Sequence, residues 1–182
     1  MEQNIDKKFR QIICGRCGTC CIEPVVPVTD SDVIRLCKGT GLEPGKIVTF
    51  FSMDEMAFDP ESDIWIQFKS GKRAMGLKKR NDRCLFLSST ICCKAYEHRP
   101  MTCRTFPYMI DFDELGNPER VRKNKIVDCK SFRKGLSYLD PVVSNVRIEI
   151  NEDELYYTKI REWNKRDVTD NKEEFLKFIG LC

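Results

Sequence analysis

The sequence lacks several features that commonly identify an enzyme. It contains a single histidine, His98, and no Ser–His–Asp arrangement can be assembled around it. The ten glycines are scattered. None of them forms the G-x-G-x-x-G or G-x-x-x-x-G-K-[ST] pattern that cradles nucleotide phosphates. Triad hydrolysis and nucleotide-dependent chemistry therefore have no support, and we assign no catalytic residue.

Long apolar segments are also missing. No stretch reaches the roughly 18 apolar residues of a membrane span. The first residues, MEQNIDKKFRQII, mix Glu2, Asp6 and Lys7 into the segment where a secretory signal would be apolar. We therefore expect a cytoplasmic protein without a membrane span. In the reducing cytoplasm, clustered cysteines are more often metal ligands or catalytic thiols than disulfides.

The charge is balanced, with 31 basic and 28 acidic residues and a formal net charge of +3. Such a mixed surface is not typical of a protein that binds polyanions. Residues 69–83 are locally basic and residues 54–63 are locally acidic. The simplest interpretation is two solvated faces, and the alternative is docking to an acidic protein or to nucleic acid. A protein partner is expected, and nucleic acid has only weak support.

The length of 182 residues predicts one compact domain with a real core, spanning 1–182. We expect an α+β, cysteine-rich fold with short helices, two small hairpins and a helical C-terminal third. The cysteine-cluster core should cover about 14–134 and the helical extension about 151–180. No internal repeat is present.

Local patterns place these elements. Residues 5–13 look like a short amphipathic helix. A helix begins after Thr29 or Asp30 as N-cap and ends near Gly39 or Gly41, and a second short helix follows Pro44. Alternating apolar residues predict a hairpin over 63–77, and Gly116 marks the turn of a second hairpin over 108–126.

Eleven cysteines are the main positive signal, and four of them stand in CGRCGTCC, residues 14–21. A C-x-x-C spacing lets both thiolates reach one ion. The run departs from the bacterial ferredoxin motif and from the C-x-x-x-C-x-x-C associated with radical S-adenosylmethionine enzymes. Because neighbouring side chains diverge, the adjacent Cys20 and Cys21 could serve two centres, two corners of one cluster, or a strained vicinal disulfide.

A second cysteine region, CLFLSSTICCKAYEHRPMTCRTFPY, begins at Cys84, and VDCKSF follows it. Together with CGRCGTCC, these motifs resemble the YkgJ-like CxxCxxCC cysteine-cluster family, described as a zinc- or iron-chelating domain. The resemblance covers roughly residues 14–129. It implies eight metal ligands: Cys14, Cys17, Cys20, Cys21, Cys84, Cys93, Cys103 and Cys129. Cys92 is an extra thiol beside Cys93, so which of the two is the ligand stays open. Cys37 and Cys182 lie outside both motifs and are expected not to bind metal.

Sulfur ligands favour zinc, iron–sulfur and Cu(I) over oxygen-loving ions. Eight thiolates exceed the need of one structural zinc. Two four-cysteine zinc sites, two four-cysteine iron–sulfur clusters or one larger cluster all fit. We expect iron–sulfur of the [4Fe–4S] type, with zinc as the alternative. Arg16, Arg99 and Arg104 are expected to stabilise the thiolates, unless they pair with Glu97, Asp82 or solvent.

These observations favour a metal-cluster protein that acts as an electron carrier or as an accessory or maturation factor for a larger enzyme. The alternative is a zinc-stabilised module that binds protein or nucleic acid. Related cysteine-cluster segments also occur in flagellin lysine methylases, which makes a methylation-related enzyme the third hypothesis. No methyl-donor site is recognisable in this sequence.

Overall fold

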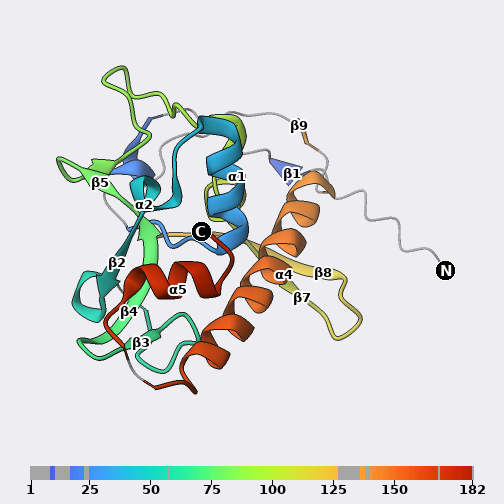
Figure 1. The fold of residues 1–182 in the computed structure, drawn as a ribbon. Helices are drawn as coiled ribbons and strands as arrows, with labels where there is room; N and C mark the ends of the chain where they lie inside the picture. The colour runs from blue at the N-terminus through green and yellow to red at the C-terminus, as the bar shows by residue number, and fades with distance from the viewer. Residues whose placement is uncertain are drawn as a thin grey trace.

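The computed structural model describes residues 9–10, 17–22, 25–56, 58–126, 136–137, 140–167 and 169–181. Helices and small antiparallel sheets together form a compact α+β fold, which confirms the expected class (Figure 1). The helices are α1 (Asp30–Thr40), α2 (Pro44–Ile47), α3 (Met101–Thr105), α4 (Asp140–Trp163) and α5 (Lys172–Phe178). Single 3₁₀ turns are η1 (Thr19–Cys21), η2 (Met53–Glu55) and η3 (Tyr96–His98).

The main sheet is antiparallel with the strand order β2-β4-β3. It consists of β2 (Val48–Ser52), β3 (Ile66–Phe68) and β4 (Gly71–Leu77). The β3–β4 pair confirms the first predicted hairpin. The sequence pattern over residues 43–53 predicts a helix after Pro44, but the helix ends at Ile47 and the following VTFFS segment pairs along β4. The β-branched and aromatic residues of VTFFS fit a pleated surface, and pairing with β4 favours a strand over a helix in this segment.

Helix α1 follows the sequence prediction closely. Thr29 is its N-cap, and the Thr29 hydroxyl accepts a hydrogen bond from the backbone of Asp32 while the Asp32 carboxylate accepts one from the backbone of Thr29. Gly41 ends the helix at a φ of 70°, in the left-handed region that favours glycine. Local capping residues therefore define both ends of this helix.

Aromatic side chains join the C-terminal helices to the main sheet. Phe50 of β2 and Phe68 of β3 both pack edge-on against Phe175 of α5, and Trp163 of α4 meets Phe175 with ring centroids 5.2 Å apart. Helix α5 accordingly lies against β2 and β3 (Figure 1). Each such ring pair contributes about 1 kcal/mol beyond the area that it buries.

Helix α4 confirms the helical C-terminal third and begins at Asp140, eleven residues before the start of the predicted pattern at Asn151. It packs against α3 and against the hairpin of β7 (Tyr108–Phe112) and β8 (Pro118–Lys123), which extends away from its side (Figure 1). This hairpin is the second predicted one. Gly116 lies in its turn at a φ of 77°.

The helix predicted over 5–13 is wrong where it can be compared. Phe9–Arg10 form strand β1, which pairs with β9 (Leu136–Ser137) from the far part of the chain. The rest of that segment lies outside the described residues. A short isolated helix is marginal in water, so pairing with a distant strand overrides its weak propensity.

Candidate metal centre

The first cysteine motif is described from Cys17 onward. Cys20 and Cys21 lie on η1, and both are half-buried. Gly18 precedes this turn at a φ of 79°, and a Cβ at this position would lie 2.5 Å from the side chain of Ile91. Only glycine fits there. This glycine therefore lets the first motif lie against the loop that carries the second.

Cys84 and Cys93 are held by that loop. Cys84 ends the small hairpin of β5 (Lys79–Arg80) and β6 (Arg83–Cys84), and Cys93 forms a β-bridge with Leu87. A bond from the backbone N–H of Lys94 to the carbonyl of Phe86, at 2.8 Å, closes the loop. Cys84 and Cys93 both pack against the hydrophobic core, whereas Cys92 is exposed.

Cys103 lies on α3 (Met101–Thr105), and hydrogen bonds hold the first two residues of this short helix. The backbone N–H of Met101 donates to the Asp32 carboxylate at 2.8 Å, and the Thr102 hydroxyl donates to Glu149 of α4 at 2.8 Å. Cys103 also packs against the core. Helices α1 and α4 therefore both position this thiol.

Cys20 and Cys21 are hydrogen-bonded to each other. Cys21 donates to the Cys20 sulfur, which together with the charge of Arg99 lowers the pKa of Cys20 to about 7, while the bond and burial raise the pKa of Cys21. The expectation that these side chains diverge is thus not met. Neither one forms a disulfide, so the vicinal disulfide considered from the sequence is absent.

The remaining thiols are electrostatic neighbours of this pair. Burial raises the pKa of Cys84, and the adjacent Cys93 and Cys20 raise it further. Burial also raises the pKa of Cys103, with added repulsion from Cys84, Cys20 and Cys93. Thiols from three separated segments therefore lie close enough to oppose one another's ionisation. We call them the five-thiol group: Cys20, Cys21, Cys84, Cys93 and Cys103.

The five-thiol group has the donor chemistry of a thiophilic metal site, because its soft sulfur atoms are half-buried against the core. Within the described ranges, no three Cys, His, Asp or Glu side chains already converge on one metal position. Cys17 is exposed, with its sulfur 3.3 Å from the Thr19 hydroxyl. Cys14 and Cys129 lie outside the described residues, as does Cys182. Cys37 packs against the core from α1.

The predicted arginines have different surroundings. Arg99 lies 3.8 Å from the centre of the Tyr96 ring, and its charge favours the Cys20 thiolate. Arg104 donates to the backbone carbonyls of Glu97 and Arg99, which are its two described hydrogen-bond partners. Arg16 lies outside the described residues. Of the two described arginines, Arg99 is thus the one with an electrostatic effect on a thiol.

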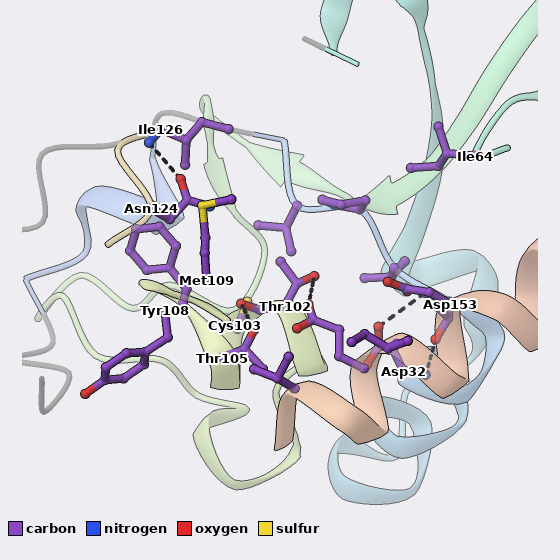
Figure 2. A pocket seen from close by; sticks show the side chains of 18 of the residues that line it. Asp32, Ile64, Thr102, Cys103, Thr105, Tyr108, Met109, Asn124, Ile126 and Asp153 are labelled. Carbon is purple, nitrogen blue, oxygen red and sulfur yellow. Dashed lines mark hydrogen bonds between the residues drawn. The ribbon is translucent and has the colours of Figure 1, made fainter. Parts of the chain in front are cut away.

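Cys20 and Cys103 also line a cavity of about 500 Å³. Figure 2 shows Asp153 at one end of this cavity and Asn124 at the other, with Cys103 between them. Most of its wall is apolar, but helix α4 adds Glu149, Asp153 and Tyr156. Sequence reasoning missed these residues. Their signal was the i, i+4, i+7 spacing of polar groups along one face of a helix.

No helix in the described part of the chain combines the length and the apolarity needed to cross a membrane. Neither curated proteins nor solved structures gave a match to this chain. A family model, CxxCxxCC, described as a "putative zinc- or iron-chelating domain", matches residues 13–131. The match spans both cysteine regions, including every member of the five-thiol group, and supports metal binding. The chain belongs to the CxxCxxCC family.

Proposed function

We propose that this chain holds an iron–sulfur cluster through its cysteine thiolates and serves a larger enzyme as an electron carrier or as an accessory factor. The observation that carries the proposal is the five-thiol group, in which sulfur atoms from three distant segments are neighbours. Cysteine thiolates are the usual ligands of iron–sulfur clusters. The bound cluster would supply a one-electron redox centre.

The surroundings of the thiols support a cluster over a single zinc ion. Five described thiols exceed the four ligands of a structural zinc. Cys84, Cys93 and Cys103 contact the core, so apolar side chains shield that side of the site from water. Burial and hydrogen bonding influence the potential of a cluster. Such shielding suits an electron carrier.

The protein contributes positioning and charge. The η1 turn, the 84–93 loop and α3 fix the sulfur atoms, and Arg99 offsets part of their negative charge. Because burial and repulsion raise the pKa of Cys84 and Cys103, these thiols bind a proton at neutral pH. A metal must displace those protons, so metal uptake should release protons.

The proposal is tested on protein purified without oxygen. We expect a brown protein with equal moles of iron and acid-labile sulfide, whose colour bleaches on reduction and returns on oxidation. Transfer of the cluster to a metal-free acceptor protein would assign the accessory role, and retention through redox cycles would assign the carrier role. A colourless protein that contains zinc and no iron would overturn the proposal in favour of a zinc-stabilised binding module.

A further inference from the structure

The cavity beside Cys20 and Cys103 has features that the metal site does not use. With about 500 Å³ it has the size of a small-molecule site, and such sites are mostly apolar with a few converging polar groups. Apolar side chains from residues 25–28 and from Phe58, Ile64 and Met109 line it. Asp32 of α1 and Asp153 of α4 lie near each other at one end of it (Figure 2), whereas Asp111 of β7 also lines it and pairs with Arg122.

Two carboxylates on α4 give this wall an excess of negative charge. Glu149 and Asp153 are four residues apart on one helix face, and both are half-buried. Among the described residues neither forms a salt bridge. Glu149 accepts hydrogen bonds from the hydroxyls of Thr105 and Thr102, which are neutral donors. The nearby Arg35 is engaged with Asp32 and Glu152, and Arg122 with Asp111.

The pKa values of Glu149 and Asp153 agree with the lack of a paired cationic side chain among the described residues. Burial, followed by the charges of Glu149, Asp32 and Glu152, raises the pKa of Asp153 to about 7. Burial also raises the pKa of Glu149. A cation between them would reverse both shifts, because an adjacent opposite charge favours the ionised carboxylate.

An independent observation comes from Tyr156, which lines the same cavity. Its side chain is 2% exposed, and within the described residues its hydroxyl has no hydrogen-bond partner. A buried hydroxyl without a hydrogen-bond partner destabilises the folded protein. A ligand N–H group in the cavity would supply the missing partner.

We propose that this pocket binds a small organic ammonium compound, with the cationic nitrogen between Glu149 and Asp153 and within reach of the Tyr156 hydroxyl. The apolar body of the ligand lies against Phe58, Ile64 and the 25–28 segment. A metal cation does not fit as well, because most of the wall around the two carboxylates is apolar and offers few further oxygen ligands. An anion is excluded by the surplus of carboxylates.

The inference does not rest on the identity of the metal, since the carboxylates, the tyrosine and the apolar wall belong to α4 and the neighbouring segments. The two sites are nevertheless adjacent. Cys20 and Cys103 form part of the pocket wall, so a bound ammonium compound would lie beside the five-thiol group. The pocket thus adds a recognition site next to the proposed redox centre.

The test uses the full-length protein and calorimetric titration with n-hexylammonium, n-hexanol and n-hexanoate near pH 8. A primary amine carries its proton there, because its pKa lies near that of lysine, about 10.4. We expect hexylammonium to bind about tenfold more tightly than hexanol, since a charge-assisted hydrogen bond contributes on that scale. Hexanoate should be the weakest ligand. Equal binding of all three compounds, or no binding of hexylammonium, would overturn the proposal.

Single substitutions test whether the proposed pocket residues bind hexylammonium. Glu149→Gln and Asp153→Asn should each weaken hexylammonium binding about tenfold. Glu162→Gln, an exposed change on the same helix, should leave it unchanged. Circular dichroism melting confirms folding. If the carboxylate variants do not fold, Tyr156→Phe decides, because it keeps the ring and removes only the hydroxyl. Unchanged affinity in these folded variants would overturn the proposal.

Metal content is measured on every sample. Iron and sulfide without hexylammonium binding would count against the pocket alone. Binding in a protein without iron would count against the proposed cluster alone.

Discussion

The backbone N–H of Met101 donates to the carboxylate of Asp32 at 2.8 Å, which ties the start of α3 to the start of α1. The same carboxylate caps α1 through the backbone of Thr29 and pairs with Arg35 at 2.6 Å. Cys103 lies two residues after Met101. One buried carboxylate therefore organises both a helix end and the position of a candidate ligand.

Asp32→Ala should destabilise the fold and displace Cys103. Breaking a buried ion pair by removing one partner costs about 3–5 kcal/mol, and the backbone N–H of Met101 also loses its acceptor. Urea unfolding of the wild type and the variant measures this difference. Asp54→Ala, at an exposed position, is the matched control and should change little. Equal stability of both variants would show that Asp32 does not organise this region.

The adjacent cysteines should each be needed for metal binding. Cys20→Ser and Cys21→Ser should both reduce bound metal, because each removes a sulfur from the five-thiol group. Their residual spectra should differ, since the two thiols have different neighbours. Cys37→Ser is the control on α1 and should keep the full metal content. A fully loaded Cys21→Ser protein with a native spectrum would remove Cys21 from the ligand set.

The second adjacent pair should behave unequally. Cys93 is half-buried beside Cys84 and Cys103, whereas Cys92 is exposed. Cys93→Ser should therefore lose metal and Cys92→Ser should retain it, as measured by metal analysis of both proteins. Loss of metal in Cys92→Ser with retention in Cys93→Ser would identify Cys92, and not Cys93, as the ligand.

Asp153→Asn should stabilise the protein more at high pH than at low pH. The pKa of Asp153 is about 7 in the folded protein and about 3.9 in an unfolded chain. The protonated carboxyl group of Asp153 therefore leaves the folded state at its full stability below about pH 4. This stability is lost as the pH rises towards 7, because the unfolded chain then releases its proton more readily than the folded protein. After allowance for solvent screening, the variant should gain about 1 kcal/mol near pH 8 and nothing near pH 4.

Urea unfolding at both pH values checks this expectation, with Glu162→Gln as the exposed control on the same helix. The same stability difference at the two pH values would show that Asp153 keeps an ordinary pKa in the folded protein.

Local signals explain which parts of the fold could be predicted. Thr29 and Gly41 carry the caps of α1 within their own sequence neighbourhood, and Gly116 marks a turn in the same way. Strands β1 and β2 were missed because their pairing with β9 and β4 is not encoded locally. These strands gain their hydrogen bonds from partners elsewhere in the chain.

In the candidate site, too, local sequence signals could be predicted and long-range packing could not. Cysteine spacing and the family resemblance indicated the thiols, whereas the neighbours of each thiol depend on how three segments pack. Glu149, Asp153 and Tyr156 gave no motif, because their significance comes from the cavity that α4 shares with α1 and α3. The hydrogen bond between Cys20 and Cys21 likewise depends on the η1 turn and could not be read from adjacency.

The central claim is that cysteine sulfur atoms hold iron in a cluster, and X-ray absorption spectroscopy at the iron edge tests it most directly. On protein purified without oxygen, we predict a first shell made only of sulfur and a second shell that contains iron. A first shell of oxygen or nitrogen, or the absence of a neighbouring iron atom, would contradict the claim.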